Sequence, residues 1–299
     1  MPALRRRAAN IIKRKTTMKY VLYNNLSGDG RGVESAAALD RLYGEDMTLI
    51  SVTEIPDLSS LALSLGESDA LVICGGDGTL NRFVNIVDTE LVRCPIFYLP
   101  CGTGNDFATD LGKQGATEPF EVTEQLKGLP TVTVNGETHK FINAVGYGID
   151  GYCSELGDKA KASGKVPNYT AIAIKGMLFG FKPRAATVTV DGVEHRFKKA
   201  WLAPAMFGRY YGGGMMAAPE QKRDDKLSVM LFHGYGRLKT LMAFPSIFKG
   251  EHVRSKMVTV LCGKEISVKF DTPASLQIDG ETMLGVSEYS ATAKVAEKV

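Results

Sequence analysis

Strand-like and helix-like segments alternate from Met18 to about residue 100. The strand-like segments are short and rich in Val, Ile and Leu, and the segments between them carry apolar residues with helical spacing. The strand-like segments lie at 18–24, 47–53, 69–76 and 94–100. Strands that are joined by helices pair in parallel, and helices cover both faces of their sheet. The sequence therefore predicts an α/β domain with a mainly parallel sheet over about residues 18–129.

The pattern changes to hairpins beyond about residue 130. Asn135-Gly136 and Asp191-Gly192 each stand between two alternating segments, and both dipeptides favour the positive φ angles of a type I′ turn. Further β segments lie at 227–232, 257–262, 265–270 and 274–279. We expect a β-rich, antiparallel, sandwich-like domain over 130–299. The last strand, 287–295, fits either domain.

Most of the excess positive charge lies in the first 19 residues. The chain has 36 basic and 33 acidic residues, and seven of the basic ones precede the first acid, Asp29. They are Arg5, Arg6, Arg7, Lys13, Arg14, Lys15 and Lys19. The rest of the chain has 29 basic and 33 acidic residues and is therefore net negative. Since a nucleic-acid-binding domain needs a basic surface, we expect no nucleic-acid partner. We interpret 1–17 as a disordered basic leader or a misassigned start; a segment resting on anionic lipid is the alternative.

Cysteine and histidine spacing excludes common metal sites. The five cysteines include no C-x-x-C pair, and the four histidines show no ligand spacing, which indicates a reduced cytoplasmic protein. The most apolar stretch, 171–181, contains Lys175 and is shorter than the ~20 residues that cross a bilayer. The leader lacks the apolar core of a secretion signal. We expect neither export nor a transmembrane helix.

Three loops that follow predicted strands are rich in glycine and small polar residues. They lie at 24–32, 75–79 and 101–106. Because loops at the carboxyl ends of parallel strands share one edge, we expect them to converge, and glycine N–H groups there suit a polyphosphate. Each loop taken alone is equally consistent with a tight turn. Neither the P-loop nor the dinucleotide fingerprint occurs in the sequence.

Several longer motifs match one family. They are GGDGTLN at 75–81, PCGTGNDFA at 100–108, the glycines at 212–214, Ala-Pro at 218–219, DDKL at 224–227 and IDGE at 278–281. Together they resemble the diacylglycerol kinase and sphingosine kinase superfamily, particularly its soluble bacterial lipid kinases. NAD kinases share the GGDGT motif. The motifs at 100–108 and 278–281 favour the lipid kinases.

The resemblance implies a lipid kinase that uses ATP and Mg²⁺, with a nucleotide cleft between the two domains. Asp77 would hold a magnesium-bound water, and Asp106 would join the same network. Asp279 and Glu281 would together take the proton of the lipid hydroxyl, unless they form only a solvated turn. The residues implied for the nucleotide are Asn24, Asn25, Leu26, Ser27, Gly28, Thr53, Gly75, Gly76, Asp77, Gly78, Thr79, Leu80, Asn81, Gly102, Thr103 and Asn105.

A second, structural magnesium is also implied by the resemblance. Its ligands would be the carboxylate of Asp225 and the carbonyls of Lys222 and Leu227. An acidic turn before a strand is the alternative, since Lys226 replaces the glycine of the family. In the first glycine-rich loop, Asn25 stands where the family usually has a proline.

Arg82 replaces the glutamate that commonly follows the GGDGTxN motif. Its cation either pairs with phosphate or signals altered activity. The alternatives to a lipid kinase are therefore a kinase for a soluble acceptor such as NAD, and a nucleotide-binding regulatory homologue with weak catalysis.

The apolar helical segment 169–181 suggests a lipid contact or, alternatively, packing against the β domain. Lys182 and Arg184 beside it would face anionic lipid. The apolar side chains are Tyr169, Ile172, Ile174, Met177, Leu178, Phe179 and Phe181. We expect a cytoplasmic enzyme at the inner face of the membrane, with a lipid substrate as its partner and a homodimer as an open possibility.

Overall fold

The computed structural model describes residues 18–24 and 31–293 of the chain. The chain divides into two compact units, Met1–Lys127 and Gly128–Val299. This division falls two residues before the boundary expected after Leu129.

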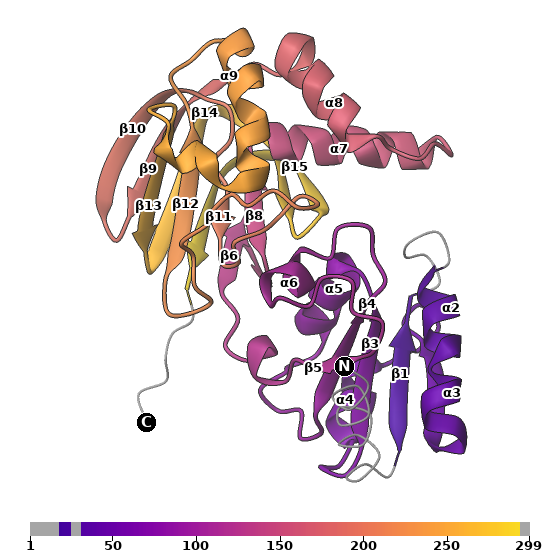
Figure 1. Ribbon diagram of the computed structural model, residues 1–299. Helices are drawn as coiled ribbons and strands as arrows, with labels where there is room; N and C mark the ends of the chain where they lie inside the picture. Colours follow the sequence, from indigo (N-terminus) through magenta and orange to yellow (C-terminus); the bar gives the residue numbers. More distant parts are fainter. Residues whose placement is uncertain (1–17, 25–30, 294–299) are drawn as a thin grey trace. The chain divides into compact units, whose positions relative to one another are not determined.

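The first unit contains a five-stranded sheet in the order β2-β1-β3-β4-β5 (Figure 1). Its strands are β1 (Lys19–Tyr23), β2 (Met47–Ser51), β3 (Ala70–Gly75), β4 (Ile96–Pro100) and β5 (Phe120–Glu121). The first four pair in parallel and β5 is antiparallel, so the predicted mainly parallel sheet is confirmed. Its helices are α2 (Arg31–Ala38), α3 (Asp40–Tyr43), α4 (Leu58–Ser64), α5 (Asp77–Ile86) and α6 (Asp106–Asp110), with short 3-10 turns at Gly44–Asp46 and Glu124–Leu126.

Helices cover both faces of this sheet because successive strand residues point to opposite sides. Val21 and Val72 belong to a buried cluster with residues of α2 and α3. Their neighbours Leu22 and Ile73 point the other way and line a pocket with Leu58 of α4 and residues of α5. All six residues of β3 are buried, as expected for a central strand that is apolar throughout.

The second unit contains a ten-stranded antiparallel sheet. Its main path runs β13-β12-β11-β8-β14-β15-β6-β7, and β9 joins β14 to β10. The strands are β6 (Thr131–Val134), β7 (Glu137–Lys140), β8 (Ala144–Tyr147), β9 (Arg184–Val190), β10 (Val193–Ala200), β11 (Ala205–Met206), β12 (Leu227–Phe232), β13 (Val258–Gly263), β14 (Glu265–Ile278) and β15 (Glu281–Thr292). The expectation of a β-rich antiparallel second domain is confirmed.

The longest strand, β14, corrects one sequence expectation. Two separate segments were predicted at 265–270 and 274–279, but the structure has one 14-residue strand. Its register against β15 shifts between Lys269 and Ala274, around Pro273. Proline has no N–H to donate to the ladder, so an irregularity there lets the strand continue. β15 pairs with β14 and β6, which places the last described strand in the second unit.

The predicted type I′ turns are present. Asn135 and Gly136 have φ angles of 53° and 84°, and Asp191 and Gly192 have φ angles of 47° and 82°. A third turn of this kind, Asp279-Gly280, joins β14 to β15 with φ angles of 46° and 99°.

A group of helices lies beside one end of the second sheet (Figure 1). They are α7 (Ile149–Ala162), α8 (Tyr169–Lys175), the π-helical η4 (Gly176–Gly180), α9 (Arg237–Ala243) and the 3-10 helices η5 (Phe244–Lys249) and η6 (Glu251–Arg254). Their inner residues pack with Trp201 and Phe232 in one buried cluster. Within 18–24 and 31–293, every helix is too short or too polar to span a bilayer.

Candidate functional site

The glycine-rich loops after β3 and β4 meet at the carboxyl ends of their strands. The N–H of Cys101 donates to the carbonyl of Gly75 at 2.8 Å. A Cβ atom added to Gly102 would lie 2.6 Å from the Cα of Gly76, and one added to Gly76 would lie 3.1 Å from the Cα of Gly102. The two backbones therefore touch, and only glycine at both positions permits this approach.

The carboxylate of Asp77 joins the two loops. Its Oδ2 accepts the N–H of Asp106 at 2.8 Å, and its Oδ1 accepts the N–H of Phe107 at 3.1 Å. These are the first N–H groups of α6, whose own N-cap residue, Asn105, supplies no side-chain cap. Asp77 thus caps a helix that begins 29 residues later. The role expected for Asp77 toward a magnesium-bound water stays a prediction.

Asn105 closes the loop after β4 on itself. Its Oδ1 accepts the N–H of Gly102 at 3.0 Å, and its Nδ2 donates to the carbonyl of the same residue at 2.8 Å. The left-handed backbone of Asn105, with φ of 53°, is tolerated by asparagine better than by most residues. The side chain of Thr103 remains exposed beside this closed turn, and the carboxyl of Asp106 is buried beneath it.

The loops after β1 and β3 make a further contact. Nδ2 of Asn24, at the end of β1, donates to Oγ1 of Thr79 at 3.5 Å. Thr79 is buried and packs against Gly75, where a Cβ atom would lie 2.5 Å from the Cβ of Thr79. Thr53 is exposed just after β2, and its Oγ1 lies 2.9 Å from Oγ of Ser51.

The remaining residues expected to bind the nucleotide divide into three groups. Leu80 and Asn81 are buried on α5, and Asn81 accepts from Nδ2 of Asn85 at 3.2 Å. Gly78 is exposed at the start of the same helix. Four predicted residues, Asn25, Leu26, Ser27 and Gly28, lie outside the described residues.

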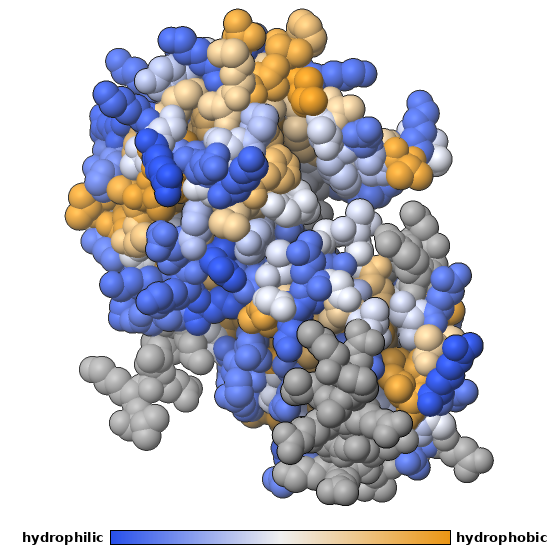
Figure 2. Space-filling model, in the orientation of Figure 1, coloured by the Kyte–Doolittle hydropathy of each residue, from blue (hydrophilic) through white to orange (hydrophobic). Residues whose placement is uncertain are grey.

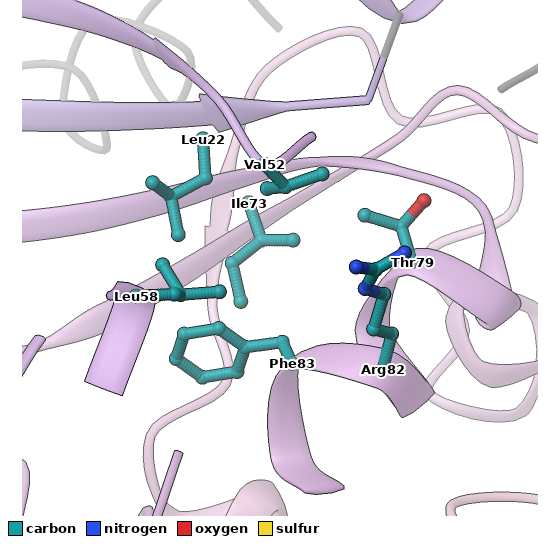
Figure 3. A pocket seen from close by; sticks show the side chains of 7 residues that line it. All are labelled: Leu22, Val52, Leu58, Ile73, Thr79, Arg82 and Phe83. Carbon is teal, nitrogen blue, oxygen red and sulfur yellow. The ribbon is translucent and has the colours of Figure 1, made fainter. Parts of the chain in front are cut away.

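A small pocket lies beside these loops (Figure 3). Most of its lining is apolar, and Thr79 and Arg82 are its two polar members. The lining residues are Leu22, Val52, Leu58, Ile73, Thr79, Arg82 and Phe83. Figure 3 shows the guanidinium group of Arg82 beside Thr79 at one end of the pocket. The residue that departs from the family pattern therefore lies next to a predicted nucleotide contact, on an exposed position of α5.

The Asp279-Gly280 turn of the second unit is more than a solvated turn. The carboxylate of Asp279 accepts three backbone N–H groups, from Ile142 at 2.5 Å and from Asn143 and Ala144 at 2.9 Å each. The turn thereby fixes the segment that leads into β8. Glu281, two residues later, has an exposed side chain. The assignment of these two acids to proton transfer stays a prediction.

Arg223 supports the same segment from the other side, and sequence reasoning missed it. Its guanidinium donates to the carbonyl of Ile142 and, at 2.9 Å, to Oδ1 of Asn143, and it lies 5.4 Å from the ring centroid of Phe207. Asn143 is only 3% exposed. Charge patterning offered no signal for it, because segment 220–226 contains three basic and three acidic residues.

Asp150, at the start of α7, is a second residue that the sequence did not single out. Its carboxyl is buried, and its Oδ2 accepts the hydroxyl of Tyr211 at 2.8 Å. Burial raises the pKa of Asp150 to about 7, although the hydrogen bond from Tyr211 opposes the shift. Tyr211 precedes Gly212, Gly213 and Gly214, whose φ angles are all positive, so the carboxyl lies beside the predicted glycine loop.

The turn expected to hold a second magnesium is occupied by protein groups. The amide of Gln221 donates to the carbonyls of Lys222 and, at 2.9 Å, Lys226, and the ammonium of Lys264 lies 2.9 Å from the carboxylate of Asp225. That ion pair lowers the pKa of Asp225. Two of the three expected ligands, Lys222 and Asp225 but not Leu227, are thus engaged by N–H donors, and the residues fit a metal poorly.

In the part of the chain that the structure describes, no three His, Cys, Asp or Glu side chains gather as a metal site.

A parallel α/β unit with converging glycine loops, followed by an antiparallel unit with an Asp-Gly turn, defines a two-domain kinase. Residues 19–135 match the diacylglycerol kinase catalytic domain, and residues 143–295 match the YegS C-terminal NAD kinase beta sandwich-like domain. The chain belongs to this family of diacylglycerol kinases and YegS-like lipid kinases.

Individual proteins of this kind are distant in sequence but similar along their length. A diacylglycerol kinase of Mycobacterium tuberculosis is 27% identical over 266 residues, which cover 83% of this chain and 84% of that protein. A diacylglycerol kinase of Bacillus subtilis is 23% identical over 235 residues, 73% of each chain. The crystal structure of a diacylglycerol kinase from Bacillus anthracis superposes with a TM-score of 0.58 at 17% identity, covering 94% of this chain and 95% of that one.

Proposed function

We propose that the chain transfers the γ-phosphoryl group of ATP to a hydroxyl group of diacylglycerol or a related lipid, with Mg²⁺ present. The convergence of the loops after β3 and β4 carries this proposal. Gly76 and Gly102 bring two backbones together at the N-terminus of α5, a ten-residue helix. Exposed N–H groups and a helix N-terminus attract phosphate oxygens. Such a cradle suits the triphosphate of a nucleotide.

The carboxylates of Asp77 and Asp106 supply the oxygen donors that Mg²⁺ prefers. Both belong to the joined loops, and Asp77 is fixed by its two hydrogen bonds to α6. When bound, the ion would neutralise charge on the phosphates, which is the main requirement of phosphoryl transfer. The contribution of this chain is to hold the two carboxylates and the phosphate-binding backbone in one rigid arrangement. No step depends on the turn around Asp225.

The acceptor hydroxyl must lose its proton as the new P–O bond forms. We assign this proton to the acidic pair Asp279 and Glu281, without dividing the role between them. The fixed turn at the end of β14 supports the assignment because it holds both residues on a defined backbone. Arg223 and Asp279 together rigidify residues 142–144, which support that turn.

Incubation with labelled ATP, Mg²⁺ and a total lipid extract tests the proposal and identifies the acceptor. We expect a labelled lipid with wild-type protein and a large loss of label with Asp77→Asn. Asp279→Asn and Glu281→Gln then test the acidic pair, and near wild-type rates in both would remove the proton acceptor from this turn. Labelling of a soluble acceptor such as NAD without lipid would favour the competing kinase reaction.

Arg82 supports one alternative, a nucleotide-binding homologue with weak catalysis. Its guanidinium lies beside Thr79, where the family commonly carries a glutamate (Figure 3). ATP binding without transfer to any lipid, together with transfer after Arg82→Glu, would establish this alternative.

A further inference from the structure

The helices beside the second sheet expose large apolar side chains on their outer side. Phe179 of η4 is 80% exposed, and Leu238 and Met242 of α9 are 66% and 68% exposed. Ile174 of α8 and Phe248 of η5 are exposed as well. These five residues are called the α8–α9 surface below. A group of exposed apolar side chains of this size marks a binding surface in many proteins.

Arg237 draws η4 and α9 together into one surface. Its guanidinium donates to the carbonyls of Met177 at 3.1 Å and Phe181 at 2.7 Å. Phe179 lies between these two carbonyls in the chain, and Leu238 directly follows Arg237. Leu238 and Met242 are one helical turn apart and so share a face of α9. Figure 2 shows apolar surface over the part of the unit where Figure 1 places α8 and α9.

The inner residues of the same helices already serve the core. Met177, Phe181 and Ile247 are almost completely buried in the cluster around Trp201. The apolar segment 169–181 therefore divides into an inner set that packs and an outer set that does not. Packing explains the first set only, because Phe179 has most of its surface in solvent.

Basic residues flank the α8–α9 surface, and acidic residues are missing from its segments. Lys175, Lys182, Lys239 and Lys249 are exposed, and within 18–24 and 31–293 none of these ammonium groups pairs with a carboxylate. Segments 159–184 and 233–250 contain nine of the 36 basic residues and none of the 33 acidic ones. This composition is complementary to a surface of negative charge with an apolar interior.

We propose that the α8–α9 surface docks on an anionic phospholipid bilayer. Phe179, Leu238 and Met242 enter the boundary between headgroups and acyl chains, and the flanking lysines contact the headgroup phosphates. The inference rests on the proposed function in one respect: a bilayer is where a diacylglycerol-like acceptor is found. A second copy of the chain fits less well, because it would bring two rings of lysines face to face.

A tryptophan at the surface reports docking directly. Phe179→Trp places an indole on the α8–α9 surface, and the only native tryptophan, Trp201, is buried. With vesicles of 3:1 phosphatidylcholine and phosphatidylglycerol, without nucleotide, we expect a blue shift of the new emission and quenching by brominated lipid. Leu91→Trp, at a position 61% exposed in the first unit, is the matched control and should show neither. An unshifted Phe179→Trp spectrum on vesicles that bind the protein would overturn the proposal.

Substitutions at the surface measure its share of the affinity. In vesicle co-sedimentation of the full chain, Phe179→Ser with Leu238→Ser should lower the affinity at least about tenfold. Leu91→Ser should leave it unchanged, and pure phosphatidylcholine should bind weakly. Equal binding by the double variant would refute docking, as would a concentration-dependent dimer that the double variant abolishes while vesicle binding persists.

A dispersed short-chain diacylglycerol separates this inference from the proposed function. The double variant should phosphorylate it at the wild-type rate, since no bilayer is involved, and should lose activity only on vesicle-borne acceptor. If wild-type protein phosphorylates no lipid but the Phe179→Trp variant still inserts its indole into vesicles, the proposed function fails and docking stands. If short-chain activity persists but no indole shift is seen, docking fails alone.

Discussion

The buried carboxyl group of Asp150 makes the stability of the second unit depend on pH. Its pKa is raised to about 7, chiefly by burial, against about 3.9 for an exposed aspartate. Between these values the folded chain keeps a proton that the unfolded chain has lost. Folding is therefore favoured at low pH, and this contribution is lost as the pH rises through 7. The full difference corresponds to at most about 4 kcal/mol.

Replacement of Asp150 by Asn removes the titrating proton and keeps an oxygen that can accept the Tyr211 hydroxyl. Of the contribution that the raised pKa makes to the free energy of unfolding, about 2.5 kcal/mol is lost between about pH 5 and pH 8. The free energy of unfolding of Asp150→Asn, relative to wild type, should therefore increase by about this amount from the lower pH to the higher. Because the variant is compared with wild type at two pH values, any pH-independent effect of the amide on the free energy of unfolding cancels. Tyr211, Cys153 and Tyr289 lie near the carboxyl, and phenol and thiol groups carry no positive charge.

Urea unfolding followed by Trp201 fluorescence is the assay. Trp201 is the only tryptophan and shares the buried cluster of Tyr211, so its signal reports the second unit. The matched control is Asp271→Asn, which makes the same chemical change at an exposed position of β14. A difference between Asp150→Asn and wild type that is equal at the two pH values would refute the reasoning.

Three further predictions concern the loops and the acidic turn. Asp77→Asn should cost the first unit about 1–2 kcal/mol, because an amide cannot accept both N–H groups of α6; faster hydrogen exchange there is the measurement. Gly102→Ala should destabilise this unit and weaken ATP binding in calorimetry, because the added Cβ would meet Gly76. Gly78→Ala should not destabilise the helix, because the space around Gly78 is open. EDTA should leave the urea midpoint of the second unit unchanged, because a lysine already pairs with Asp225.

A specific result would contradict each of these three predictions. Unchanged amide exchange in α6 would show that the cap contributes little to its stability. Equal melting temperatures for the two alanine variants would show that the loops tolerate a methyl group where they touch. A lower urea midpoint in EDTA, restored by Mg²⁺, would return a metal to the acidic turn.

Local patterns and a topological rule predicted much of the fold. The dipeptides Asn135-Gly136 and Asp191-Gly192 predicted hairpin turns because positive φ angles depend on the residue itself. The convergence of the loops around Gly76 and Gly102 followed from the rule that parallel strands end at one edge. Neither inference needed knowledge of side-chain packing.

The contacts that define the candidate site could not be predicted in this way. Asp77 meets N–H groups 29 and 30 residues away, and Asp279 meets N–H groups 135 to 137 residues away. Such pairs depend on the exact register of strands and helices, which composition and periodicity do not encode. The split of 169–181 into buried Met177 and exposed Phe179 depends likewise on where Arg237 anchors the neighbouring helix.

The pairing of β14 determines when each unit can fold during translation. The sheet of the first unit needs no residue beyond Glu121, so it can form while the ribosome is still adding the rest of the chain. β14 must instead pair with β8, β9 and β15, and it is synthesised only after residue 264. A nascent chain halted shortly before this point would carry a finished first unit and an open, aggregation-prone sheet.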